Sequence, residues 1–82
     1  MLSQTTDTIR NFIQQELLFE EPGVTVADDA KLLEGMVDSL GLLQLVAFLE
    51  SEFEVQIDEA DINVANFETV AAIAALIDRS RN

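Results

Sequence analysis

The chain has 82 residues, with 16 acidic and 4 basic side chains, a formal net charge of -12, and neither Cys nor His. Without thiols and imidazoles it can form no disulfide, thiolate nucleophile, zinc site or Ser-His-Asp hydrolase. Nucleic acids and anionic membranes bind Lys and Arg, so the charge excludes them as expected partners and favours proteins with basic patches.

The length allows one small domain, and we expect it to cover residues 1–82. Hydrophobic residues make up 49% of the chain, which is typical of globular rather than disordered proteins. The longest apolar runs are too short to span a bilayer, and the first residues lack the pattern of a signal peptide. We therefore expect a cytoplasmic monomer.

The first predicted helix covers residues 3–18, where apolar residues recur at helical spacing: Ile9, Phe12, Ile13 and Leu17. Three residues could cap its start: Ser3, Thr5 and Thr6. The helix should end before Pro22-Gly23.

A long connection follows over residues 19–38, and connections of this length are usually functional or packed across the core. A short helical turn is predicted over residues 30–33. Apolar residues could hold the connection against the domain: Val24, Val26, Leu32, Leu33 and Met36.

The second predicted helix runs from Ser39 to Phe53. Its core stripe consists of Leu42, Leu45, Val46, Leu49 and Phe53. Gly41 weakens the first turn by roughly 1 kcal/mol relative to Ala, so this end is predicted to be mobile. Phe48 lies at the edge of the stripe, where we expect it to pack.

The following segment contains polar residues between predicted apolar anchors: Ile57, Ile62, Val64 and Phe67. One short helical turn fits residues 59–62. Acidic residues gather here, but their spacing lacks the Gly and final Glu of an EF-hand, so no metal site is expected: Asp58, Glu59 and Asp61.

The last predicted helix has one apolar face, formed by Val70, Ile73, Ala74 and Ile77. Thr69 is its predicted N-cap, and Arg79 and Arg81 suit its negative C-terminal end. Because no segment alternates with the period of a strand, the chain is predicted to be an all-α four-helix bundle, with three main helices, one short helix and a long first loop.

The stretch "GMVDSLGLLQLVAFLESEF" has two capping residues, Asp38 and Ser39, before one helix. On that helix Leu40, Leu43 and Ala47 lie toward the side of Ser39, away from the centre of the core stripe. Exposed apolar residues bordered by charge are typical of partner-binding surfaces. A phosphate on Ser39 would meet the free N–H groups of the helix start. The second capping residue is therefore a candidate attachment point.

At these residues the sequence resembles acyl carrier and peptidyl carrier proteins, which share a Gly, two apolar residues and Asp-Ser-Leu at the start of the second helix. The resemblance extends from about Leu32 to Ile77. It implies that Ser39 carries 4′-phosphopantetheine through a phosphodiester, and that the terminal thiol holds a cargo as a thioester. Asp38 and Leu40 match the neighbours of the family's Ser.

A carrier of this kind needs no catalytic residues of its own, so the resemblance implies a protein that is not an enzyme. Its implied partners are a phosphopantetheinyl transferase, a cargo-loading ligase or adenylating enzyme, and downstream acyl-processing enzymes. The predicted partner contacts are Met36, Val37, Asp38, Leu40, Leu43, Ala47 and Glu50.

The sequence departs from carriers of fatty-acid synthesis, which tend to hold acids at the third and sixth positions counted from the Asp-Ser pair. Gly41 and Gln44 stand there instead. This departure favours a dedicated pathway of the secondary-metabolite type, with an acyl or an aminoacyl cargo.

Other interpretations stay open. Asp38 and Ser39 could be capping residues only, Leu43 could be a core residue, and Glu50 could belong to a solvated helix end with Glu52 and Glu54. The chain could then be an acidic helical adaptor that docks a partner through Leu40, Leu43 and Ala47. An enzyme using carboxylates is disfavoured, because no paired acids lie near a credible pocket.

Overall fold

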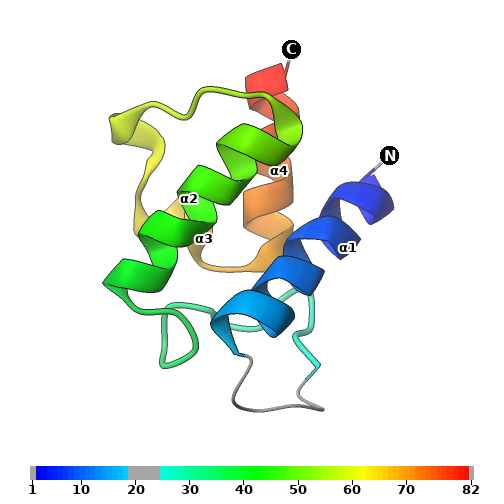
Figure 1. Cartoon of the computed structure of the whole chain (residues 1–82), viewed down its shortest axis with the longest axis vertical. Coiled ribbons are helices and arrows are strands. Elements are labelled where there is room, and N and C mark those ends of the chain that lie inside the picture. Colours follow the sequence, from blue (N-terminus) through cyan, green and yellow to red (C-terminus); the bar gives the residue numbers. More distant parts are fainter. Residues whose placement is uncertain (1, 19–24, 82) are drawn as a thin grey trace.

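The computed structural model describes residues 2–18 and 25–81, and these ranges contain helices and no strand. In chain order the elements are α1 (Leu2–Phe12), the π-helical turn η1 (Ile13–Leu17), α2 (Ser39–Phe53), the 3-10 turn η2 (Glu59–Asp61), α3 (Val64–Phe67) and α4 (Val70–Arg81). Figure 1 shows them in a single bundle. The prediction of an all-α bundle with three main helices, one short helix and a long first loop is confirmed.

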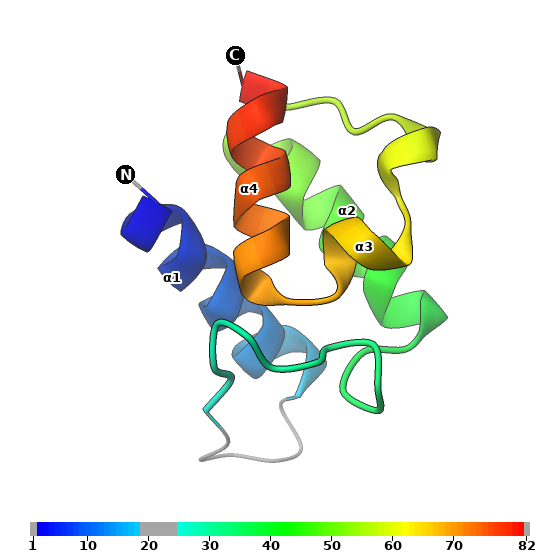
Figure 2. The same ribbon diagram turned by 180° about the vertical axis from the view of Figure 1, so that it is seen from behind.

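The buried faces of the helices follow from the apolar periodicity of the sequence. Ile9 and Ile13 from the first helix, Leu45 and Leu49 from α2, and Ile73 from α4 have at most 1% of their surface exposed. The predicted face of α4 is buried throughout, whereas Leu42 and Phe53 at the ends of the α2 stripe are partly exposed. Figure 2 shows α4 between α1 and α3, and both of these helices pack against it.

The start of the first helix differs from the prediction. α1 begins at Leu2, so the three candidate caps lie inside the helix rather than before it. Thr8 uses its hydroxyl to donate to the Gln4 carbonyl one turn earlier, at 3.0 Å. The helix ends at Leu17 after a wide turn in which the Leu18 N–H donates to the Ile13 carbonyl at 2.9 Å. Pro22-Gly23 and Val24 lie outside the described residues.

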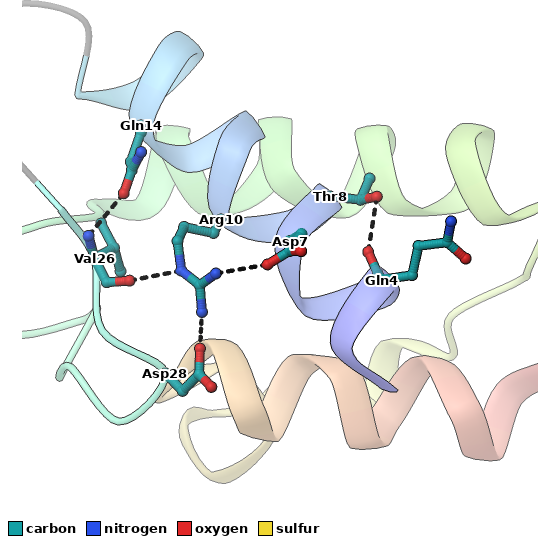
Figure 3. Close-up of polar contacts among 7 residues, drawn as sticks. All are labelled: Gln4, Asp7, Thr8, Arg10, Gln14, Val26 and Asp28. Carbon is teal, nitrogen blue, oxygen red and sulfur yellow. Dashed lines mark hydrogen bonds and ion pairs between the residues drawn. The ribbon is translucent and has the colours of Figure 1, made fainter. Parts of the chain in front are cut away.

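The loop before α2 is fixed to the bundle on two sides. Val26 donates its N–H to Gln14 Oε1 at 2.7 Å and accepts from Arg10 Nε at 2.8 Å (Figure 3). On the other side, the Leu32 N–H donates to the Glu68 carbonyl at 2.8 Å. Val26 and Leu32 are fully buried. The loop therefore crosses the bundle as a packed segment, as its length predicted.

The predicted helical turn over residues 30–33 is wrong, because a tight turn over residues 32–36 takes its place. The N–H groups of Met36 and Val37 both donate to the Leu32 carbonyl, at 3.2 and 2.8 Å. Gly35 has a φ of 105°, a conformation that side chains disfavour, which explains a glycine at this turn. The turn delivers the chain to the start of α2.

Two other local predictions agree with the structure. Thr69 caps α4, since its Oγ1 accepts from the Ala72 N–H at 3.0 Å. The 3-10 turn at Glu59–Asp61 occupies the place of the predicted short turn. None of the helices in the described ranges is long and apolar enough to cross a membrane.

Candidate functional site

The two polar residues at the start of α2 have separate roles. Asp38 is the N-cap, with extended backbone angles, and its Oδ1 accepts from the Gly41 N–H at 2.8 Å. Ser39 is the first helical residue and is exposed. Its hydroxyl makes no hydrogen bond to any residue in the described ranges. Since the Asp38 side chain caps the helix, the Ser39 hydroxyl is accessible and has no hydrogen-bond partner among the described residues.

This hydroxyl suits a phosphate ester. The first turn of a helix leaves backbone N–H groups without intrahelical partners and carries a partial positive charge, which favours an attached phosphodiester. No buried contact of Ser39 would have to break for the group to be attached. The site therefore fits a covalently bound phosphopantetheine arm.

Gly41 is buried in the first turn of α2 because three segments meet there. A Cβ at this position would lie 3.3 Å from Asp38 Oδ1, 3.3 Å from Val37 Cγ1 and 3.7 Å from Leu17 Cδ2. The first two distances are tighter than most Cβ contacts, so these neighbours would have to shift by a few tenths of an ångström. Whereas the sequence indicated only a weak helix start, the structure gives Gly41 a packing role against the loop and the end of the first helix.

The apolar residues next to Ser39 lie on the surface. Leu40 is 65% exposed, Leu43 is 62% exposed, and Ala47 is exposed one turn further along α2. The alternative that Leu43 belongs to the core is therefore wrong. These residues form an apolar strip that begins beside the attachment residue.

A third large exposed apolar residue was missed by the sequence analysis. Val64, predicted to be an anchor, is 65% exposed, whereas Ile57 and Phe67 are buried. The reason is the cap of α3, in which Asn63 Oδ1 accepts from the Asn66 N–H at 3.0 Å and sets the start of the helix. Asn63 was the available signal, because Asn is a preferred N-cap residue whose side chain accepts a hydrogen bond from a backbone N–H in the first turn of the helix.

Two of the predicted partner contacts have structural roles in the fold. Val37 is only 6% exposed and belongs to the core, so it supports the site from below rather than presenting a surface. Glu50 is partly buried, and its Oε2 accepts from the Ile57 N–H at 2.9 Å, so it holds the loop after α2 and is not simply a solvated residue. Met36 is half-buried, while Glu52 and Glu54 are exposed.

Phe48 packs as predicted, because its ring stacks on Phe12 with a centroid distance of 4.1 Å. The acidic residues Asp58, Glu59 and Asp61 do not converge on one point. Within residues 2–18 and 25–81, no three His, Cys, Asp or Glu side chains are placed to hold a metal ion.

Comparison with known proteins agrees with this geometry. A family model described as "Phosphopantetheine attachment site" matches residues 7–77. The acyl carrier protein of Thermotoga maritima is 36% identical over 72 residues, which cover 87% of this chain and 84% of that protein. A chain in a structure described as "Crystal structure of FAD-dependent dehydrogenase" is 38% identical, with a TM-score of 0.76 over 84% of this chain and 97% of that chain.

Members of this family interact with a phosphopantetheinyl transferase and with acyl-processing enzymes, and they carry cargo without catalysing reactions themselves. The family model matches most of this chain, and its sequence is 36% identical to an acyl carrier protein. The chain therefore belongs to the acyl carrier protein family and carries covalently attached 4′-phosphopantetheine.

Proposed function

We propose that Ser39 is the attachment residue and that residues 1–82 act as a single carrier domain, as a monomer in the cytoplasm. The observation that carries the assignment is the division of roles at the start of α2. Asp38 satisfies the capping requirement, and the exposed Ser39 hydroxyl has no partner among the described residues. A hydroxyl in this position is accessible to an enzyme without any rearrangement of the fold.

In the attachment step, Ser39 Oγ forms a bond to the phosphorus of the pantetheine phosphate of coenzyme A. The bond from that phosphorus to the adenine nucleotide breaks, and the hydroxyl proton passes to a base of the transferase. The arm supplies a thiol that holds the cargo as a thioester. The chain itself contributes a fixed helix start whose N–H groups and dipole favour the phosphodiester charge.

The cargo is proposed to be an acyl or aminoacyl group of a dedicated pathway, loaded by a ligase or an adenylating enzyme. Gly41 and Gln44 stand where carriers of fatty-acid synthesis tend to hold acids, and the close packing around Gly41 leaves no room for a long side chain without a shift of its neighbours. The apolar strip of Leu40, Leu43 and Ala47 is the proposed contact for these enzymes.

The similar chain in the structure described as an FAD-dependent dehydrogenase favours one further step within this proposal. A flavin enzyme would oxidise the carrier-bound cargo, with FAD accepting two electrons and two protons from it. Purified flavin dehydrogenases offered the loaded carrier would show this step as a loss of two hydrogens from the cargo mass.

The assignment of Ser39 is tested by intact mass after incubation with a phosphopantetheinyl transferase and coenzyme A. The wild type should gain one phosphopantetheine, Ser39→Ala should gain none, and Ser51→Ala, an exposed serine of the same helix, should gain one. A labelled Ser39→Ala variant would place the arm elsewhere. A wild type that gains no mass would favour the adaptor that docks a partner through Leu40, Leu43 and Ala47.

A further inference from the structure

A shallow groove runs between the first helix (α1 with η1) and α2. Its floor is formed by Phe12 and Phe48, which are half-buried and stack with a centroid distance of 4.1 Å. Phe48 follows Ala47 in the chain and lies about 100° further round α2, so the groove does not belong to the apolar strip. The volume of about 280 Å³ is below the roughly 300–1,000 Å³ of small-molecule sites. The groove is therefore a second surface, with the size for protein side chains.

The groove has one carboxylate beyond each side of the ring pair. Glu16 lies four residues after Phe12, and Glu52 lies four residues after Phe48. The two helices run in opposite directions, as Figure 1 shows, and Glu16 lines a hollow at the start of α2, whereas Glu52 lines one near the start of α1. Each acid is thus about one helical turn from the rings, in opposite directions. This places the two acidic residues about 11 Å apart along the groove.

Within the described ranges, no base of the chain forms an ion pair with these carboxylates. Glu16 and Glu52 are exposed, and the ion pairs that Arg10 and Lys31 form are with other acids. Arg81 lines the hollow next to Glu52 but forms no ion pair with it. In a chain with a net charge of -12, both ends of the groove would attract basic side chains, whereas the rings between them favour an apolar one.

The order acid, ring pair, acid fits a helix that has the order base, apolar turn, base. Residues i and i+7 of a helix lie on one face about 10.5 Å apart, which matches the separation of the two acids, and the side chains at i+3 and i+4 fall between them on the same face. A groove between two helices also suits a third helix that packs on both. No two of the four bases of this chain stand seven residues apart, so a second copy does not supply the pattern.

We propose that this groove docks a helix of a partner protein, with basic residues at i and i+7 and apolar residues at i+3 and i+4. The two bases lie at Glu16 and Glu52, and the apolar residues cover the rings of Phe12 and Phe48. The contact uses neither Ser39 nor the phosphopantetheine arm. It therefore goes beyond the proposed carrier function, because a partner can hold the chain in the same way before and after the arm is attached.

The probes are two Ala-rich peptides of about 20 residues, long enough to form helices in water. The matched peptide carries Arg at i and i+7 and Leu at i+3 and i+4, and the permuted peptide has the same composition with Arg and Leu on opposite faces. Equal composition removes the general attraction of an acidic protein for any cationic peptide, and physiological salt screens distant charges. In calorimetric titration the matched peptide should bind about tenfold more tightly, because only it covers the rings while it meets both acids.

Variants of the protein locate the contact. Glu16→Gln combined with Glu52→Gln should raise Kd for the matched peptide about fivefold. Glu34→Gln combined with Glu59→Gln removes the same charge from exposed positions outside the groove and should leave Kd within about twofold. Ser39→Ala should bind as the wild type. Thermal melts establish that each variant is folded, and the NMR amide signals that shift on binding should centre on the groove residues Asn11, Gln15 and Glu52.

Equal Kd values for the two peptides, or equal effects of the two double variants, would overturn the inference. NMR shifts centred on Leu40 and Leu43 would move the contact to the apolar strip and overturn it as well. A dimer in sedimentation equilibrium that the groove variant abolishes would assign the groove to a second copy instead of a partner. Failure of the proposed attachment at Ser39 is distinguishable, because it appears in the intact mass after incubation with the transferase and leaves the peptide titrations unchanged.

Discussion

Arg10→Ala is predicted to destabilise the protein strongly, because this side chain joins α1 to the loop that leads to Ser39. Arg10 Nε donates to the Val26 carbonyl and Nη1 to Asp7, both at 2.8 Å, and Nη2 forms an ion pair with Asp28 (Figure 3). The Arg10 side chain is only 22% exposed. Its removal leaves the buried Val26 without the partner for its carbonyl.

The magnitude follows from the kind of each contact. A hydrogen bond from a charged donor contributes about 1.5–3 kcal/mol. The two aspartates have side chains 67% and 59% exposed, so their ion pairs with Arg10 are screened by solvent and add little. A loss of about 2–3 kcal/mol is a large part of the roughly 5–15 kcal/mol that stabilises a domain. At this chain length it corresponds to a fall of roughly 8–24 °C in melting temperature.

The assay is thermal and urea unfolding followed by circular dichroism, with Lys31→Ala as the matched control. Lys31 also forms an ion pair, with Glu68 at 2.7 Å, but it is 56% exposed and no backbone carbonyl among the described residues depends on it. The control should therefore lose much less melting temperature than Arg10→Ala does. Equal losses in the two variants would refute the reasoning, because they would show that the bond from Arg10 to the buried loop adds nothing beyond a surface ion pair.

Three further outcomes are expected. Leu43→Ala should slow cargo loading of the phosphopantetheine-bearing protein more than Glu50→Gln does, with no loss in melting temperature, because Leu43 is 62% exposed and the amide introduced by Glu50→Gln keeps an acceptor for the loop; equal loading rates for wild type and Leu43→Ala would remove Leu43 from the partner surface. Moderate salt or a millimolar divalent cation should raise the melting temperature, since 16 acidic and 4 basic side chains repel one another in the compact state, and a melting temperature that ignores ionic strength would contradict this. The hydrogen bond to Glu68 raises the pKa of Lys31 above its ordinary value of 10.5. The pair therefore stabilises the fold fully below pH 10.5 and loses this effect as the pH rises through the folded-state pKa. A stability difference between wild type and Lys31→Ala that is the same on both sides of pH 10.5 would argue against it.

The main helices could be predicted from the sequence because their buried apolar residues recur with the regular period of a helix. The predicted core positions Leu45, Leu49, Ile73 and Ile77 are all buried, since one helical face determines one side of the bundle. Thr69 could be predicted as a cap for a similar reason, because its hydrogen bond closes within three residues.

Short segments without a period could not be assigned in this way. Val37 and Val64 are both valines with a polar residue on one side and an apolar residue on the other, yet one is 6% and the other 65% exposed. Val37 is drawn inward by the hydrogen bond from its N–H to the Leu32 carbonyl, whereas Val64 follows the Asn63 cap at the first position of α3. Apolarity alone does not separate these outcomes.

At the attachment site, too, the features that depend on neighbouring residues could be predicted, whereas those that depend on tertiary packing could not. Asp38 and Ser39 could be recognised from the sequence, because capping and helix-start chemistry depend on neighbouring residues. The packing role of Gly41 could not be recognised from the sequence, because helix propensity measures only the cost of a glycine within its own helix. A Cβ at position 41 would lie 3.3 Å from Asp38 Oδ1 and Val37 Cγ1, and in ordinary contact with Leu17 Cδ2 at 3.7 Å. These side-chain positions are set by the cap, the loop and the end of the first helix, which a propensity scale does not describe.

A side chain at position 41 would therefore have two opposing effects on stability. Alanine would strengthen the first turn of α2 by roughly 1 kcal/mol through helix propensity, but its methyl group would lie 3.3 Å from both the Asp38 carboxylate and Val37. The methyl group would require a shift of a few tenths of an ångström from these neighbours. Since Asp38 is the cap and Val37 belongs to the core, such a shift would act on the start of the helix that presents Ser39. The helix-propensity cost of a glycine at position 41 is thus offset by the close contacts with Asp38 and Val37 that its missing side chain permits.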